Sequence, residues 1–542
     1  MFQRLFSLVV PLVLLFVFVE RAACIEVPPA LPGWEEFDQR RDGFRRGVTL
    51  DGAMVNRSSP VIADIDGDPS NGLEVVVGGA DGIVHAYRAD GSKLWSTSLP
   101  IRGCSRTDET NKLYSSPAVG RLFRGKAIFV VIGYGGFGAD GKACGGGVAA
   151  IRGRTGKIRW NFNLKRFARR NKIPALSYSV FSTPALADVD GDGRMEIGFG
   201  TFSRYSFLLE AGGKLRWYYC NADTVWSSPA FADVDGDGQL EMIIGSDITR
   251  NDHLRPPTPN GGYVVALRTK KRSKKHIWFR DSSAVVWETY FDQTIMSSPV
   301  VADVLPGNPG AEILIGSGCY FPENSRNKNG KWVKILRLRD GKVLKTLPTQ
   351  ACLSSSVAVG DIDQDQRLEV VAIVNGSKSV GGTGQSELVA WKPNIPGPLW
   401  VTTPKVQGKN DPFAGDFKSP VIADLDGNGS LEVIISNGVG LAIFNGADGS
   451  ALTCQDKVCD QRPSLSLFVG NSLEATPAVG DLNQDGILDL VIGSGSRIVS
   501  GKGGLYVWSG FAEKLGSYPG TLAPYSAPWP MFRGNPARHG RY

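Results

Sequence analysis

The fold of this chain is decided by a unit seen most completely in Asp188-Val-Asp-Gly-Asp-Gly-Arg-Met-Glu196. The unit lies between two short apolar segments, Ser182-Thr-Pro-Ala-Leu-Ala187 and Ile197-Gly-Phe-Gly200. Short apolar runs bounded by turn residues are typical of buried strands. The turn between them carries carboxylates at alternate positions and a glutamate at the ninth, and clustered oxygens of this kind bind Ca²⁺. The sequence therefore predicts a strand, a candidate calcium loop and a second strand.

Eight copies of this unit follow one another at intervals of 45 to 70 residues. The copy quoted above is the third. The second copy has no carboxylate in its turn, residues 121–126, and the fifth keeps only Asp303 and Glu312. The first copy has two additional residues before Glu74. A period of this length indicates a repeat architecture rather than a series of unrelated domains.

Each copy is followed by sequence suited to two more strands. A third apolar segment follows most copies, as in Gly82-Ile-Val-His-Ala-Tyr87, and turns such as Ala89-Asp-Gly-Ser92 then predict a hairpin. Because four-stranded units in series form propeller blades, we expect an all-β, eight-bladed β-propeller of four-stranded blades. A seven-bladed ring is the alternative if the second copy is not a full blade. Several expected fourth strands carry a tryptophan: Trp95, Trp160, Trp217, Trp278 and Trp400.

The propeller is expected to span residues 58–518, with other segments at both ends. Residues 1–24, in which Arg4 precedes an apolar run, resemble a secretory signal peptide, and the run is short for a membrane span. Lipidation at Cys24 is an alternative. Residues 25–57 are expected to form an extended lead-in, and residues 519–542 a closing segment across the junction of the first and last blades.

The repeated pattern, Ser-x-Pro followed by Asp-x-Asp-x-Asp-Gly-x-x-Asp/Glu, resembles the FG-GAP or VCBS repeats of calcium-binding propellers, including integrin α-chain heads. The resemblance covers about residues 58–510 and implies that side chains at positions one, three, five and nine and the carbonyl at position seven bind Ca²⁺. It implies about five or six calcium sites. The candidate ligands are Asp64, Asp66, Asp68, Glu74, Asp188, Asp190, Asp192, Arg194, Glu196, Asp233, Asp235, Asp237, Gln239, Glu241, Asp361, Asp363, Asp365, Arg367, Glu369, Asp424, Asp426, Asn428, Ser430, Glu432, Asp481, Asn483, Asp485, Ile487 and Asp489.

The alternative for these loops is a set of ordinary Asp-Gly turns held by Asx hydrogen bonds. Clustered carboxylates without a cation would repel one another, which favours calcium. Turns such as Thr155-Gly-Lys-Ile-Arg-Trp160 are also similar to the repeats of PQQ-type propellers.

Propeller topology separates the acidic turns from the long insertions. The turns between first and second strands lie on one face, whereas the loops from second to third strand and between blades lie on the other. Long loops on a rigid scaffold are typical sites of recognition, and the alternative is that they only close that face. Seven cysteines fall in these loops and suggest three disulfides with Cys220 left over. The expected pairs are Cys104 with Cys144, Cys319 with Cys352, and Cys454 with Cys459.

We expect a secreted or cell-surface protein, periplasmic in a Gram-negative cell, that binds calcium and acts as a non-enzymatic binding or adhesion module. Its partner would be an extracellular protein or glycan, and the basic segment 165–172 on the loop-rich face suits an acidic one. The net charge of +7 is spread thinly, which argues against nucleic acid. We expect a monomer without a transmembrane segment.

Two enzymatic alternatives remain open. A calcium-dependent polysaccharide lyase, similar to the rhamnogalacturonan lyases, would need a base that no residue pattern singles out. A quinoprotein dehydrogenase is more remote, because the adjacent cysteine pair it would want does not occur here.

Overall fold

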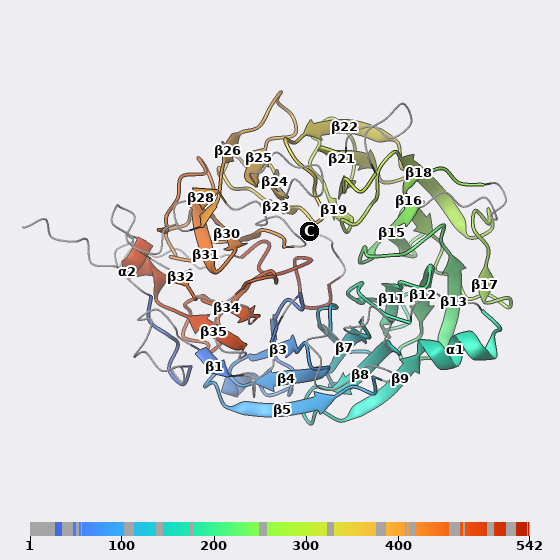
Figure 1. The fold of residues 1–542 in the computed structure, drawn as a ribbon, viewed down its shortest axis with the longest axis horizontal. Helices are drawn as coiled ribbons and strands as arrows, with labels where there is room; N and C mark the ends of the chain where they lie inside the picture. Colours follow the sequence, from blue (N-terminus) through green and yellow to red (C-terminus); the bar gives the residue numbers. More distant parts are fainter. Residues whose placement is uncertain are drawn as a thin grey trace, which may run out of the picture.

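The computed structural model shows a closed ring of β-sheets around a central channel (Figure 1). The structure describes residues 28–34, 47–49, 54–55, 57–101, 113–136, 145–173, 178–248, 257–321, 330–375, 386–406, 409–410, 418–454, 465, 467–469, 472–495, 503–515, 527–538 and 540. The predicted signal peptide, residues 1–24, lies outside the described residues, as do Cys24, Cys104, Cys144 and Cys459.

Each blade is an antiparallel sheet whose first strand lines the channel, since the inner strands of neighbouring blades contact one another. Blades one and two are β2 (Val61–Ala63), β3 (Glu74–Gly78), β4 (Ile83–Tyr87), β5 (Lys93–Ser98) and β6 (Ala118–Gly120), β7 (Phe129–Tyr134), β8 (Gly147–Arg152), β9 (Ile158–Asn163). Blades three and four are β10 (Ala185–Ala187), β11 (Glu196–Gly200), β12 (Tyr205–Leu209), β13 (Leu215–Cys220) and β14 (Ala230–Ala232), β15 (Glu241–Ile248), β16 (Gly261–Leu267), β18 (Val285–Phe291). Blades five and six are β19 (Val300–Ala302), β20 (Glu312–Gly316), β21 (Trp332–Arg337), β22 (Val343–Pro348) and β23 (Ala358–Gly360), β24 (Glu369–Val374), β25 (Glu387–Trp391), β26 (Trp400–Thr402). Blades seven and eight are β29 (Val421–Ala423), β30 (Glu432–Asn437), β31 (Gly440–Asn445), β32 (Leu467–Phe468) and β33 (Ala478–Gly480), β34 (Asp489–Ser494), β35 (Gly504–Trp508), β1 (Gly47–Thr49).

The remaining elements are short. They are β17 (His276–Ile277), the hairpin β27 (Lys405–Val406) and β28 (Lys409–Asn410), helices α1 (Leu164–Arg170) and α2 (Phe511–Leu515), and the 3₁₀ turn η1 (Pro69–Asn71).

The eight-bladed prediction is confirmed, and the seven-bladed alternative is wrong. The second copy of the repeat forms a full blade, β6 to β9, although its turn carries no carboxylate. The apolar and glycine pattern of a blade is therefore sufficient for its four strands, and the acidic turn is an addition to it.

The prediction that Trp278 lies on the fourth strand of blade four is wrong. That strand is β18, which carries Trp287, whereas Trp278 is 67% exposed. The long connection after β16 instead adds β17 in parallel to the edge of β13, with Tyr218 opposite His276. The outer edge of β13 has backbone groups that β17 can hydrogen-bond, whereas a local turn would leave them unpaired. Only the arrangement of the blades in the ring shows that this edge lies close to residues 276–277.

The fourth-strand tryptophans join consecutive blades. The Nε1 groups of Trp95, Trp160, Trp287 and Trp400 donate to backbone carbonyls in the next blade at distances from 2.5 to 2.9 Å. A Cβ built on Gly449 would lie 2.6 Å from the Trp400 ring, so the glycine is what lets the indole lie flat on the turn.

The ring is closed by the lead-in. β1 pairs with β35 as the outer strand of blade eight, so part of segment 25–57 belongs to the propeller itself. Trp34 is fully buried and donates to the Ala89 carbonyl of blade one at 2.7 Å. It thereby takes the place of the fourth-strand tryptophan that blade eight lacks.

A closed circle of hydrogen bonds surrounds the channel at the start of the inner strands. In each blade, the serine or threonine two residues before the inner strand accepts a hydrogen bond from the equivalent backbone N–H of the preceding blade, at 2.8 to 3.3 Å. Eight such bonds return to the starting residue, so the ring closes without a gap. Its members are Ser59, Ser116, Thr183, Ser228, Ser298, Ser356, Ser419 and Thr476.

The C-terminal segment fills the channel rather than closing the junction of the first and last blades alone. In Figure 1 the C-terminus lies at the centre of the ring. Carbonyls of this segment accept hydrogen bonds from inner-strand N–H groups of five blades, at Val119, Leu186, Val301, Ile422 and Val479. The segment therefore contacts more blades than the two that the sequence predicted. The physical reason is that channel-facing N–H groups around the whole ring require hydrogen-bond partners.

Two arginines of the segment add contacts to four blades, including blades one and four, which are not among the five named above. Arg533 donates to the carbonyls of Pro229 and Pro299, and Arg538 to those of Pro60 and Pro117. Both guanidinium groups are fully buried. Among the described residues, every blade except the sixth hydrogen-bonds this segment, which is called here the plug.

Candidate calcium sites

Five acidic loops bring three carboxylates together. In each, positions one, three and nine of the repeat offer oxygen atoms that all lie within 4.8 Å of one another. The loops belong to copies one, three, four, six and seven, and they are called here sites one, three, four, six and seven. Their members are Asp64, Asp66, Glu74; Asp188, Asp190, Glu196; Asp233, Asp235, Glu241; Asp361, Asp363, Glu369; and Asp424, Asp426, Glu432. The two additional residues of the first copy form η1 and leave Glu74 within its cluster.

The side chain at position five does not join these clusters. It accepts a hydrogen bond from the backbone N–H of position seven, at 2.6 to 3.2 Å. The acceptors are Asp68, Asp192, Asp237, Asp365, Asn428 and Asp485, and the donors include Arg194, Gln239, Arg367, Ser430 and Ile487. Position one likewise accepts loop N–H groups, as Asp188 does from Asp192 and Gly193. The loops are therefore Asx-stabilised turns that also gather carboxylates.

The carboxyl group at position nine is anchored on one oxygen only. Oε2 of Glu432 accepts the Leu425 N–H at 2.7 Å, and the equivalent bond recurs in the other sites. The second oxygen is buried without a hydrogen-bond partner among the described residues in Glu74, Glu369 and Asp489. A buried carboxylate oxygen without a donor is unfavourable unless it is protonated or meets a cation.

Burial raises the pKa of these groups, and the neighbouring aspartates raise it further. The pKa is about 7 for Glu74, Glu196, Glu241 and Glu369, and about 9 for Glu432. Site seven, whose three carboxylates are all buried, therefore has the greatest need of a positive charge.

Three of the sites already contact a basic side chain that the sequence pattern did not reveal, with the shortest contacts in sites six and three. Lys392 Nζ lies 2.6 Å from Asp363 and 2.7 Å from Asp365 in site six. Arg216, almost fully buried, pairs with Asp190 and lies 3.3 Å from Glu196 in site three. Lys392 directly follows the third strand of its blade, and Arg216 lies on the fourth. Residues beside the acidic turn, and not only within it, thus decide the local charge.

The fifth copy satisfies its own glutamate. Glu312 accepts the Val304 N–H at 2.9 Å through Oε2 and the Asn308 amide at 2.6 Å through Oε1. Both oxygens of Glu312 therefore have a hydrogen-bond donor without a cation, which agrees with the altered turn. In the acidic turn of the eighth copy, Asn483 occupies position three beside Asp481 and Asp489, so positions one, three and nine supply two carboxylates where the five sites supply three.

The oxygen donors of these loops suit Ca²⁺, which takes carboxylate, amide and carbonyl oxygens with little demand on geometry. When bound, the ion would supply positive charge to the buried carboxylates. All these sites lie in the turns between first and second strands, hence on one face of the ring.

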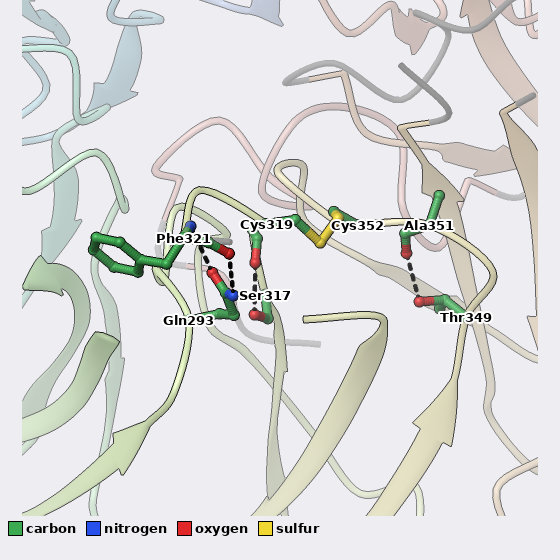
Figure 2. The surroundings of a disulfide bond; sticks show 8 residues. Gln293, Ser317, Cys319, Phe321, Thr349, Ala351 and Cys352 are labelled. Carbon is green, nitrogen blue, oxygen red and sulfur yellow. Dashed lines mark hydrogen bonds between the residues drawn. A yellow bond between two sulfur atoms is a disulfide. The ribbon is translucent and has the colours of Figure 1, made fainter. Parts of the chain in front are cut away.

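The opposite face carries the disulfide Cys319–Cys352, with Cα atoms 5.7 Å apart. It joins the loop after β20 to the segment that leads into β23 (Figure 2). Gln293 holds the same loop through two hydrogen bonds to the Phe321 backbone. This predicted pair is confirmed. Cys454 is also disulfide-bonded, with its partner outside the described residues, and Cys220 is free.

Comparison with known proteins supports the repeat and the fold. Residues 475–508 match the model of the FG-GAP repeat, which here comprises β33 to β35 and the acidic turn between β33 and β34. The chain is thus an eight-bladed β-propeller with an FG-GAP repeat, as the resemblance implied. No curated protein sequence matches it significantly.

The solved structures that match this chain share little sequence with it. Quinohemoprotein alcohol dehydrogenase from Comamonas testosteroni matches at a TM-score of 0.51 and 13% identity, over 88% of this chain and 76% of that one. The exotype rhamnogalacturonan lyase YesX matches at 0.48 and 16%, over 89% and 75%, and BamB from Moraxella catarrhalis at 0.45 and 14%, over 84% and 100%. Such identities concern the fold alone.

Within the part of the chain that the structure describes, no helix is long and apolar enough to cross a membrane.

Proposed function

We propose that this chain is an exported, calcium-stabilised β-propeller that binds an extracellular protein or glycan without transforming it. The observation that carries the proposal is that the two faces of the ring differ in chemistry. The five acidic clusters of the described residues lie at one end of the inner strands, whereas a solvent-accessible hollow lies at the other end.

A structural role for calcium is supported by the repetition of the sites. Each acidic turn joins the two inner strands of a blade and holds position nine against the backbone at position two. An ion there would neutralise buried carboxylates that otherwise must take up protons at neutral pH. A ligand bound only to the folded state stabilises that state.

A binding role for the opposite face is supported by what lies there. The loop after β20 is fixed by a disulfide, which also suits an exported protein. The plug fills the channel below, so the hollow ends within the molecule and does not continue through it. Closed, lined hollows on a rigid scaffold are typical of ligand sites.

Two measurements test this proposal. Thermal melting with excess calcium and with EGTA should differ clearly, and an unchanged midpoint would contradict structural calcium. A glycan array and a screen of extracellular proteins should reveal a ligand that is recovered unchanged. Formation of unsaturated uronate from a pectic polymer, abolished by a chelator without unfolding, would replace the binding role by the lyase alternative.

A further inference from the structure

We propose that the hollow at the channel mouth binds a carboxylate-bearing sugar unit of an acidic glycan. This inference rests on the proposed binding function and names the site and the chemical class of its ligand.

The rim of the hollow is built by one position of the repeat, the residue immediately before the paired hydroxyl residues of the first six copies. Six of these residues line it, and Phe532 of the plug contributes from below. They are Arg57, Tyr114, Phe181, Trp226, Met296 and Ser354. The position varies in chemistry from blade to blade, unlike the hydroxyl residues that follow it. Its side chains are therefore not required by the ring itself.

Three of the lining residues form a continuous aromatic wall. The ring centroid of Phe181 lies 4.4 Å from that of Tyr114 and 4.9 Å from that of Trp226. Phe202 supports both Phe181 and Trp226 from behind, with centroids at 4.9 Å. The negative face of an aromatic ring attracts weakly positive C–H groups, and one side of a pyranose ring presents several of them.

Hydroxyl groups surround the floor of the hollow. Ser59, Ser116, Thr183, Ser228, Ser298 and Ser356 belong to both the lining and the hydrogen-bonded circle. Each hydroxyl oxygen of the circle accepts a backbone N–H, so its own O–H proton remains available as a donor. A compact sugar presents oxygen acceptors around its whole circumference. An extended peptide also presents N–H donors, for which this floor offers fewer acceptors.

The charge of the hollow favours an acidic ligand. Arg57 is the one charged side chain among its described lining residues, and its guanidinium carbon lies 5.2 Å from the centre of the Tyr114 ring. A guanidinium group binds a carboxylate through two parallel hydrogen bonds. The same face bears helix α1, which contains no acidic residue. Its basic side chains are all exposed: Lys165, Arg166, Arg169 and Arg170.

The test is calorimetric titration of the calcium-loaded full chain with oligogalacturonate and with a neutral galacto-oligosaccharide of equal length. Binding should be confined to the acidic oligosaccharide. R57Q should weaken it about tenfold or more, the loss expected for a charge-assisted hydrogen bond. Y114L should weaken it through loss of the aromatic wall. R339Q, on the turn at the opposite face, and W278A, at the outer edge, are matched controls that should bind normally.

Melting curves of each variant establish that it is folded before binding is compared. Equal binding of acidic and neutral sugars, unchanged affinity in both R57Q and Y114L, or no binding to the acidic oligosaccharide would each overturn the proposal. Binding of a peptide with a free C-terminal carboxylate, together with no sugar binding, would overturn the proposal and assign the hollow to peptides. Glycan binding that survives both variants would leave the proposed function intact and move its site, whereas calcium-independent melting would contradict the proposed function separately.

Discussion

The carboxyl group at position nine is the residue on which each acidic turn depends. One of its oxygens is fixed by a backbone N–H at position two, and the other faces the carboxylates of positions one and three. Without a cation, protonation is the way to remove the negative charge from such a buried group. Proton and calcium binding should therefore compete at these sites.

Glu432→Gln isolates the contribution of site seven. Because burial raises the pKa of Glu432 to about 9, this group is already protonated at neutral pH without calcium, and glutamine imitates that state. We expect the calcium-free melting temperature to change little. The stabilisation by calcium should fall by about 2–3 kcal/mol at a hundredfold excess over Kd. E312Q in the fifth copy is the control, and an undiminished calcium effect in E432Q would show that site seven binds no ion.

Lys392→Gln should have the opposite effect on calcium at site six. Lys392 contacts Asp363 and Asp365, so its removal leaves two carboxylates without their cation. We expect a less stable calcium-free protein and about tenfold tighter calcium binding at one site, measured by titration calorimetry. Lys270 lies 3.0 Å from Asp237 but is 53% exposed, so K270Q should change affinity much less. Weaker calcium binding in K392Q would contradict the competition.

The stability of the calcium-free protein should fall as the pH rises from about 4.5 through 7. The folded-state pKa of Glu74, Glu196, Glu241 and Glu369 is about 7, above the ordinary value of 4.5, because these groups are buried beside other carboxylates. The folded state therefore holds more protons than the unfolded state in this window, and the stability is fully present below it. Melting after removal of calcium on a chelating resin tests this. The stabilisation by added calcium should be larger above pH 7 than below pH 4.5. A calcium-free melting midpoint that rises with pH through this window would contradict the prediction.

Among the elements, the inner strands carry the contacts that hold the blades together at the channel. Their hydroxyl circle and the tryptophans of the outer strands join neighbours at the two edges of each blade. Removal of one bond in a closed circle leaves a donor that no flanking blade can satisfy.

Ser228→Ala should destabilise the propeller by about 1–3 kcal/mol, because it leaves the buried Thr183 N–H without an acceptor. The measurement is the free energy of unfolding, or the melting temperature if unfolding is irreversible. S98A, at an exposed end of β5, is the control and should be neutral. An S228A variant as stable as the control would show that the circle is a geometric consequence of packing and not a source of stability.

For the whole molecule, closure depends on segments at both ends of the chain. β1 and Trp34 complete blade eight against blade one, while residues 529–540 hydrogen-bond seven of the inner strands. Contacts of such long sequence separation form only when the ring is assembled.

A chain that ends at Ala527 should melt at a clearly lower temperature than the full chain. Removal of the plug deprives inner-strand N–H groups, including those of Val119 and Val479, of their acceptors. A synthetic peptide of residues 527–542 should restore much of the loss, whereas a scrambled peptide should not. An unchanged midpoint would show that the channel needs no plug.

The sequence alone determined the inner strands, the repeated blades and the acidic turns, because each depends on residues close together in the chain. Alternating apolar runs, the Asp-Gly turns and position nine of the repeat are local signals, and the structure places Glu74 in its cluster despite two additional residues. The Cys319–Cys352 pair was also predictable, since both cysteines lie in loops that follow strands of blade five on the same face of the ring.

Only the tertiary structure decided how the ring is closed and which charges meet. The contact of Lys392 with site six, the addition of β17 to blade three and the plug in the channel join segments that no local pattern relates. The channel mouth is the clearest case, because its lining comes from six blades and from Phe532 of the plug. Each repeat specifies the backbone hydrogen bonds of its own blade. Which residues line the channel together depends on the closed ring, because those residues are far apart in the sequence and meet only when the blades surround a common axis.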